Sequence, residues 1–113
     1  MLIGYRNERL KRVCNSEEHA RKHLPDEVHV RTLFRRLKEI SAFDSFYEIP
    51  SDKPFRRHKL KGKRKGEWGI TIRGGWRICI VPAGEYEMDD SRHPLLSTVR
   101  SIIVTDIIDY HGG

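Results

Sequence analysis

The sequence feature that most constrains the fold is a pair of strand-like runs joined by two glycines. Residues 68–73 (WGITIR) and 76–81 (WRICIV) are rich in β-branched and aromatic residues, and Gly74-Gly75 lies between them. Two such runs joined through Gly-Gly are a strong signal of a β-hairpin, because glycine readily adopts the backbone conformations of tight turns. The chain is therefore expected to build an antiparallel sheet around this hairpin.

The length of the hairpin loop decides which side chains share a face. A two-residue loop at Gly74-Gly75 would place Arg77 among the apolar side chains of the first strand. A three-residue loop that starts at Arg73 shifts the register by one and leaves Arg77 beside Thr71 on the other face. Because an unpaired buried guanidinium costs several kcal/mol, we predict the three-residue loop, with Gly75 left-handed. One face then collects Trp68, Ile70, Ile72, Trp76, Ile78 and Ile80.

The N-terminal part of the chain carries helix signals. Residues 2–5 form either an edge strand or the lead-in to a helix. Asn7 and Ser16 are expected to cap two short helices, the second of which ends near Leu24. A longer helix follows, with residues 25–27 in its first turn. Its apolar residues recur at helical spacing: Val30, Leu33, Phe34, Leu37 and Ile40.

The remaining segments complete the fold prediction. Residues 41–54 and 82–96 are expected to be loops, and residues 98–110 a long strand. In that strand, alternation places Ile102, Val104, Ile108 and Tyr110 on one face, and Ser101, Ile103, Thr105, Ile107, Asp109 and His111 on the other. Helices followed by antiparallel strands predict one α+β domain over residues 1–113.

The positive charge of the chain is concentrated directly before the hairpin. The chain has 22 basic and 16 acidic residues. Eight of the basic ones lie within residues 53–66, which contain no acid, so the rest of the chain has 14 basic residues against 16 acidic ones. Clustered charge of this kind favours a polyanionic partner, such as nucleic acid, over a merely soluble surface.

Cellular location and metal binding are constrained by a few further features. Cys14 and Cys79 are too few for a disulfide framework, which indicates reduced thiols in a cytoplasmic protein. We expect no signal peptide and no membrane span. His19 and His23 share a helix face but lack a convincing third ligand, so we interpret them as two solvated histidines and expect no metal and no cofactor.

Several polar residues could carry chemistry together. They are His58 and Lys61 before the hairpin, Arg77 within it, and Asp109, Tyr110 and His111 at the chain end. RNA cleavage without a metal needs a base for the 2′-hydroxyl, an acid for the leaving oxygen and cations for the phosphorane. Histidine suits either proton-transfer role, and Lys or Arg suits the charge role. Composition alone equally allows an ordinary polar chain end.

The sequence contains three separated motifs, HKLKG (residues 58–62), WRI (76–78) and VTDIIDYH (104–111), together with RKGEW (64–68). In these motifs the sequence resembles the HigB-type toxins of the RelE/ParE superfamily of type II toxin–antitoxin systems. The resemblance implies helices packed on a small antiparallel sheet and ribosome-dependent endonucleolytic cleavage of mRNA. It also implies neutralisation by a HigA-type helix-turn-helix antitoxin. By motif position, the resemblance assigns the family's catalytic site to His58, Lys61, Arg77, Asp109, Tyr110 and His111. The RNA strand is expected on Arg56, Arg57, Lys59, Lys63, Arg64, Lys65 and Arg73.

The sequence departs from the family pattern in two places and leaves a rival function open. Thr71 stands where many members have a second Arg, for which Arg73 could substitute. The loop over residues 82–96 is longer than in compact members. The rival is a non-enzymatic binder, either a ParE-like gyrase inhibitor or an RNA- or ribosome-binding domain, because phosphate contacts give affinity without chemistry. The terminal histidine together with His58 favours the enzyme.

Overall fold

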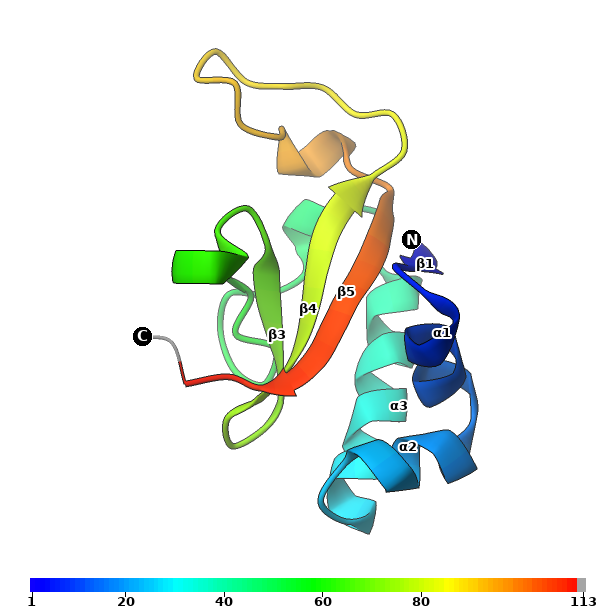
Figure 1. The fold of residues 1–113 in the computed structure, drawn as a ribbon. Coiled ribbons are helices and arrows are strands. Elements are labelled where there is room, and N and C mark those ends of the chain that lie inside the picture. The colour runs from blue at the N-terminus through cyan, green and yellow to red at the C-terminus, as the bar shows by residue number, and fades with distance from the viewer. Residues whose placement is uncertain (112–113) are drawn as a thin grey trace.

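Three helices pack against a five-stranded sheet in the computed structural model, which describes residues 1–111 (Figure 1). The helices are α1 (Glu8–Asn15), α2 (Glu17–His23) and α3 (Glu27–Ala42). In their order across the sheet, the strands are β1 (Leu2–Tyr5), β5 (Ser101–Asp109), β4 (Trp76–Ala83), β3 (Trp68–Arg73) and β2 (His58–Lys59). Short 3-10 turns are η1 (Phe46–Glu48), η2 (Gly62–Arg64) and η3 (Leu96–Thr98). The predicted α+β class is confirmed.

The sheet is mixed, so the prediction of a purely antiparallel sheet is wrong at one edge. β1 runs parallel to β5, with Leu2 opposite Ser101 and Tyr5 opposite Val104. A parallel pair needs a long crossover, and here all three helices and the hairpin intervene between the two strands. Of the two alternatives for residues 2–5, the structure has the edge strand.

Each helix begins directly after a residue whose side chain caps its N-terminus. Asn7, Ser16 and Asp26 accept hydrogen bonds from the amides three residues later, which satisfies donors that a helix N-terminus leaves free. The two caps predicted at Asn7 and Ser16 are confirmed. The third helix starts at Glu27, so residues 25–26 are not in its first turn as predicted, because Asp26 is the cap itself.

The two strands of the hairpin have the predicted faces, but the predicted three-residue loop is wrong. Ile70 lies opposite Ile78, and Thr71 lies opposite Arg77, as expected. The turn itself is the two-residue Gly74-Gly75, and a bulge between Thr71 and Arg73 absorbs the extra residue. Gly74, with φ +56°, is left-handed instead of Gly75.

A second bulge changes the facing of the last strand. Cys79 lies opposite Asp106 while the next residue of β4 lies opposite Val104, so Thr105 is the extra residue. Strict alternation, which placed Ile107 with Thr105, is therefore wrong beyond this point. Ile107 is fully buried in the core opposite Ile78. Ile108, and Tyr110 after it by alternation, point to the opposite face from Ile107.

The core lies between the helices and one face of the sheet. The strands β3, β4 and β5 bury apolar side chains against α1, α2 and α3. Residues with no more than 1% of their surface exposed include Leu10, Val30, Leu33, Ile40, Phe46, Ile70, Ile78, Ile80, Ile102 and Ile107. His23 is part-buried and its Nε2 lies 2.6 Å from the carbonyl oxygen of Ile107, so it is not the solvated histidine that the sequence suggested. In the described part of the chain, none of the helices is long and apolar enough to cross a membrane.

Both thiols are expected to resist modification in the native protein. Burial raises the pKa of Cys14 and of Cys79 from 9.0 to about 12. An unfolded thiol releases its proton above about pH 9 and a folded one only near pH 12, so their contribution to stability is intact below pH 9 and is lost as the pH rises towards 12. Ellman's reagent at pH 8 should modify neither thiol in the native protein and both in urea. Rapid modification of either native thiol would contradict this placement.

Candidate functional site

His58 is held by backbone at the free edge of the sheet. It lies on β2 opposite Gly69, whose missing Cβ makes room for the imidazole: an added methyl group would lie 3.2 Å from His58 Cε1. Its Nδ1 lies 2.7 Å from the carbonyl oxygen of Arg56, a residue with a left-handed backbone (φ 46°). Because a carbonyl oxygen only accepts hydrogen bonds, Nδ1 is the donor. In the neutral ring Nε2 is then the basic nitrogen.

Arg77 and Thr71 form a cross-strand pair with buried polar atoms that lack partners. The guanidinium Nη1 of Arg77 donates to the carbonyl oxygens of Gly74 (2.6 Å) and Trp76 (3.0 Å). Arg77 Nε and Thr71 Oγ1 are both buried, and neither has a hydrogen-bond partner among the described residues. Burial lowers the pKa of Arg77, and the neighbouring charge of Arg56 lowers it further. The pair therefore places two buried polar atoms without partners next to each other across β3 and β4.

The chain end meets the basic segment at one hydrogen bond. The backbone N–H of Lys61 donates to the hydroxyl oxygen of Tyr110 at 3.2 Å, although 49 residues separate them in the sequence. The Tyr110 amide in turn donates to the carbonyl oxygen of Gly75 at 2.8 Å. After β5, the chain therefore turns across the hairpin end of the sheet towards the β3 side (Figure 1). Tyr110 thus joins the chain end to the basic segment and to the hairpin turn.

Asp109 and His111 lie against the hairpin turn. His111 Nε2 is 3.2 Å from Asp109 Oδ1. A methyl group added to Gly75 would clash with Asp109 Oδ1 and lie 3.2 Å from His111 Cε1. Gly75 is thus needed for this close approach, whereas Gly74 is needed for its backbone conformation. The side chain of His111 is 79% exposed, so it can receive a ligand without rearrangement of the core.

His58 and Arg77 project from the same face of the sheet, the one opposite the helices. His58, Gly69 and Cys79 form one row across β2, β3 and β4, and Arg77 stands in the next row. From the usual spacings of strands and residues, the Cα atoms of His58 and Arg77 are ~12 Å apart. Both side chains can therefore reach one ligand that lies between them.

A network on this face was not predicted from the sequence. Arg64 pairs with Glu67 (3.1 Å) and Asp106 (2.5 Å), and the Thr105 hydroxyl donates to the Glu67 carboxylate. Burial lowers the pKa of Arg64, but the hydrogen bond to Asp106 and the surrounding negative charge outweigh it and raise the pKa overall. The network fixes η2 to β5. Its only sequence signal is the polar pair Thr105-Asp106 within an apolar strand.

The residues predicted to bind RNA fall into two groups. Arg64 is engaged in that network, and Arg57 lies among the rings of η1 and β3, with its guanidinium donating to the carbonyl oxygens of Phe46 and Tyr47. Burial lowers the pKa of Arg57. The guanidinium groups of these two arginines are therefore occupied by contacts within the protein. The other five predicted positions carry exposed cations: Arg56, Lys59, Lys63, Lys65 and Arg73.

The described residues contain no cluster of three His, Cys, Asp or Glu side chains that could hold a metal ion. Cys79 lies on the same face as His58, but it is fully buried and its raised pKa keeps it protonated. The imidazoles of His58 and His111 are groups that can transfer protons, and Arg77 is a cation held by backbone carbonyl oxygens.

Comparison with known proteins does not place the chain in a family: no protein-family model matches it, and no curated protein sequence matches it significantly.

Removing the Tyr110 hydroxyl should loosen the basic segment specifically. Tyr110→Phe leaves the Lys61 amide without its acceptor, so its hydrogen exchange should accelerate, and the free energy of unfolding should fall by about 1 kcal/mol or less. Tyr47→Phe is the control, because Tyr47 is 66% exposed. Exchange at Lys61 measured by NMR would argue against the contact if both variants matched the wild type.

Proposed function

We propose that the protein is a HigB-type toxin of the RelE/ParE superfamily that cleaves translated mRNA on the ribosome. The observation that carries this proposal is the Thr71–Arg77 pair, whose buried unpartnered donors stand on the face that also presents His58. Unsatisfied buried donors are rare in proteins, and a bound group that accepts from them is one explanation. A phosphate offers such acceptor oxygens, and Arg can donate to them in pairs.

Cleavage would proceed by attack of the neighbouring 2′-hydroxyl. A histidine takes the 2′-hydroxyl proton, O2′ bonds to phosphorus, and the bond from phosphorus to O5′ breaks while an acid returns a proton to O5′. The products are a 2′,3′-cyclic phosphate and a 5′-hydroxyl. Arg77 and Lys61 would neutralise the added charge on the phosphorane.

The two histidines differ in ways that suit different roles. Nδ1 of His58 donates to a backbone oxygen, which leaves Nε2 with a lone pair and suits the base. His111 lies beside the Asp109 carboxylate, which would orient its imidazole, and it would serve as the acid. Tyr110 would position the RNA against Lys61, to which its hydroxyl is already joined. Thr71 would donate to the phosphate in place of the second arginine of other members.

The proposed partners follow from the same resemblance. A HigA-type helix-turn-helix antitoxin would neutralise the toxin, and the ribosome would supply the mRNA. The exposed cations of residues 53–66 would contact phosphates of the mRNA or of the ribosomal RNA, because such contacts give affinity without sequence preference.

Substituting either histidine should abolish most cleavage. His58→Ala and His111→Ala should each reduce mRNA cleavage in a translating extract by a factor of about 10²–10⁴, the usual contribution of a general acid or base. Primer extension on a translated message measures the breaks. His19→Ala is the matched control, because His19 is an exposed histidine on α2.

Cleavage by both site variants at the wild-type rate would end the catalytic assignment. Growth arrest with intact mRNA and inhibited DNA supercoiling would instead favour the gyrase-directed rival.

A further inference from the structure

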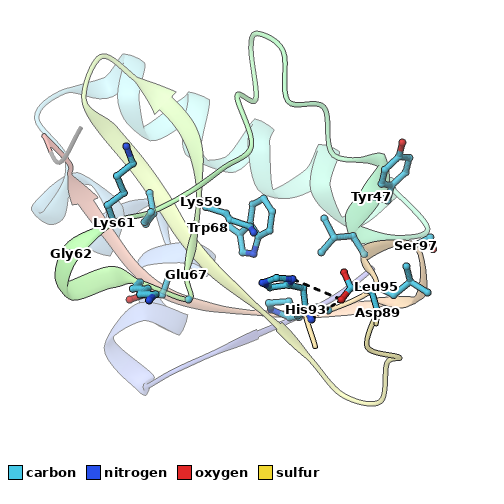
Figure 2. A pocket seen from close by; sticks show the side chains of 16 residues that line it. Tyr47, Lys59, Lys61, Gly62, Glu67, Trp68, Asp89, His93, Leu95 and Ser97 are labelled. Atoms are coloured by element: carbon cyan, nitrogen blue, oxygen red, sulfur yellow. Dashed lines mark hydrogen bonds and ion pairs between the residues drawn. The ribbon is translucent and has the colours of Figure 1, made fainter. Parts of the chain in front are cut away.

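A groove lies beside the candidate catalytic face, between the β2–η2 segment and the loop that follows β4 (Figure 2). Its volume is about 1090 Å³. Pockets for single small molecules usually measure roughly 300–1,000 Å³. The groove is thus large enough for an extended occupant. No local sequence pattern indicates it, because its walls come from segments about 30 residues apart.

The interior of the groove offers aromatic and aliphatic surface. Trp68 and Tyr47 line it from β3 and η1, and Leu95 lines it from the loop (Figure 2). Tyr47 is 66% exposed and Leu95 is 40% exposed, although both are large and hydrophobic. Met88, 55% exposed, lies opposite the lining residue Pro94. Two of the five large exposed hydrophobic side chains of the described chain, Tyr47 and Leu95, therefore line this groove.

The free charges along the groove are positive. Lys59, Lys61 and Lys65 line one wall, and the Lys59 ammonium lies 5.6 Å from the centre of the Trp68 ring. The two carboxylates that line the groove, Glu67 and Asp89, already have hydrogen-bond partners within the protein. Glu67 is bound by Arg64 and Thr105, and Asp89 accepts from backbone amides of its own loop, which lowers its pKa.

We propose that this groove binds an unpaired RNA strand that extends from the cleavage site. Bases would stack on Trp68 and Tyr47, and phosphates would lie along the lysine wall. Grooves that bind single strands combine aromatic platforms with cations in this way. Lys59 is exposed, so its ammonium can leave the indole face for a phosphate when a base arrives.

The groove shares Lys61 with the candidate catalytic site, on which this proposal rests. Lys61 lines the groove, and its backbone amide donates to the Tyr110 hydroxyl. The lysine wall also distinguishes the occupant from an apolar peptide, which would not need three free ammonium groups beside an indole. An acidic peptide is the competing occupant, and the experiment separates the two.

The experiment measures binding without cleavage. The full-length protein is titrated into a short labelled 2′-O-methyl oligoribonucleotide, which cannot be cut because its 2′-oxygen is blocked, and fluorescence anisotropy reports binding. Tyr47→Ala should weaken binding by about tenfold or more, the loss expected when a base loses its stacking surface. Leu95→Glu should weaken binding as well, because it places a negative charge in the groove that would repel the phosphates. Val28→Glu is the matched control, because Val28 is 39% exposed on α3, away from the groove, and it should bind as the wild type does.

Equal binding by Leu95→Glu, Tyr47→Ala and Val28→Glu would overturn the groove proposal, as would a wild-type protein that binds an acidic peptide but no oligonucleotide. Because the strand is blocked against cleavage, its binding is measured independently of the catalytic proposal. Cleavage without groove-dependent binding sinks only the groove, and groove-dependent binding without cleavage sinks only the nuclease.

Discussion

Burial of one face of the β3–β4 hairpin against α3 is the interaction on which the rest of the structure depends. Ile70, Ile78 and Ile80 are fully buried on that face, and the facing residues of β5 extend the same apolar surface. Because neighbouring residues of a strand point to opposite faces, burying the isoleucines commits Arg77 to the other side. Hydrophobic burial on one side thereby determines where the cations of the candidate site stand.

Two β-bulges change which face of the sheet the following side chains occupy. The bulge before Arg73 lets a two-residue turn coexist with the register that keeps Arg77 out of the core. The bulge at Thr105 brings Ile107 into the core and turns Tyr110 to the side where it meets Lys61. Bulges are often found near functional sites because they redirect side chains. Here each one places a residue of the candidate site.

The candidate catalytic residues and the groove differ in how they are built. His58, Arg77 and Tyr110 are oriented by backbone hydrogen bonds and by missing Cβ atoms at Gly69 and Gly75. The groove is instead walled by long side chains and a loop, so it can adapt to an occupant. Oriented polar groups beside an adaptable surface are what the proposed cleavage of a flexible strand would require.

The helix caps at Asn7 and Ser16, the hairpin and the faces of its strands could be predicted from the sequence. Each of these depends on a local pattern: a capping side chain, a Gly-Gly turn, or alternating apolar residues. The parallel pairing of β1, the bulge at Thr105, the contacts that hold Arg57 and Arg64, and the groove could be recognised only in the folded chain. These depend on contacts between segments far apart in the chain, where a one-residue change of register reverses a side chain and no local pattern records it.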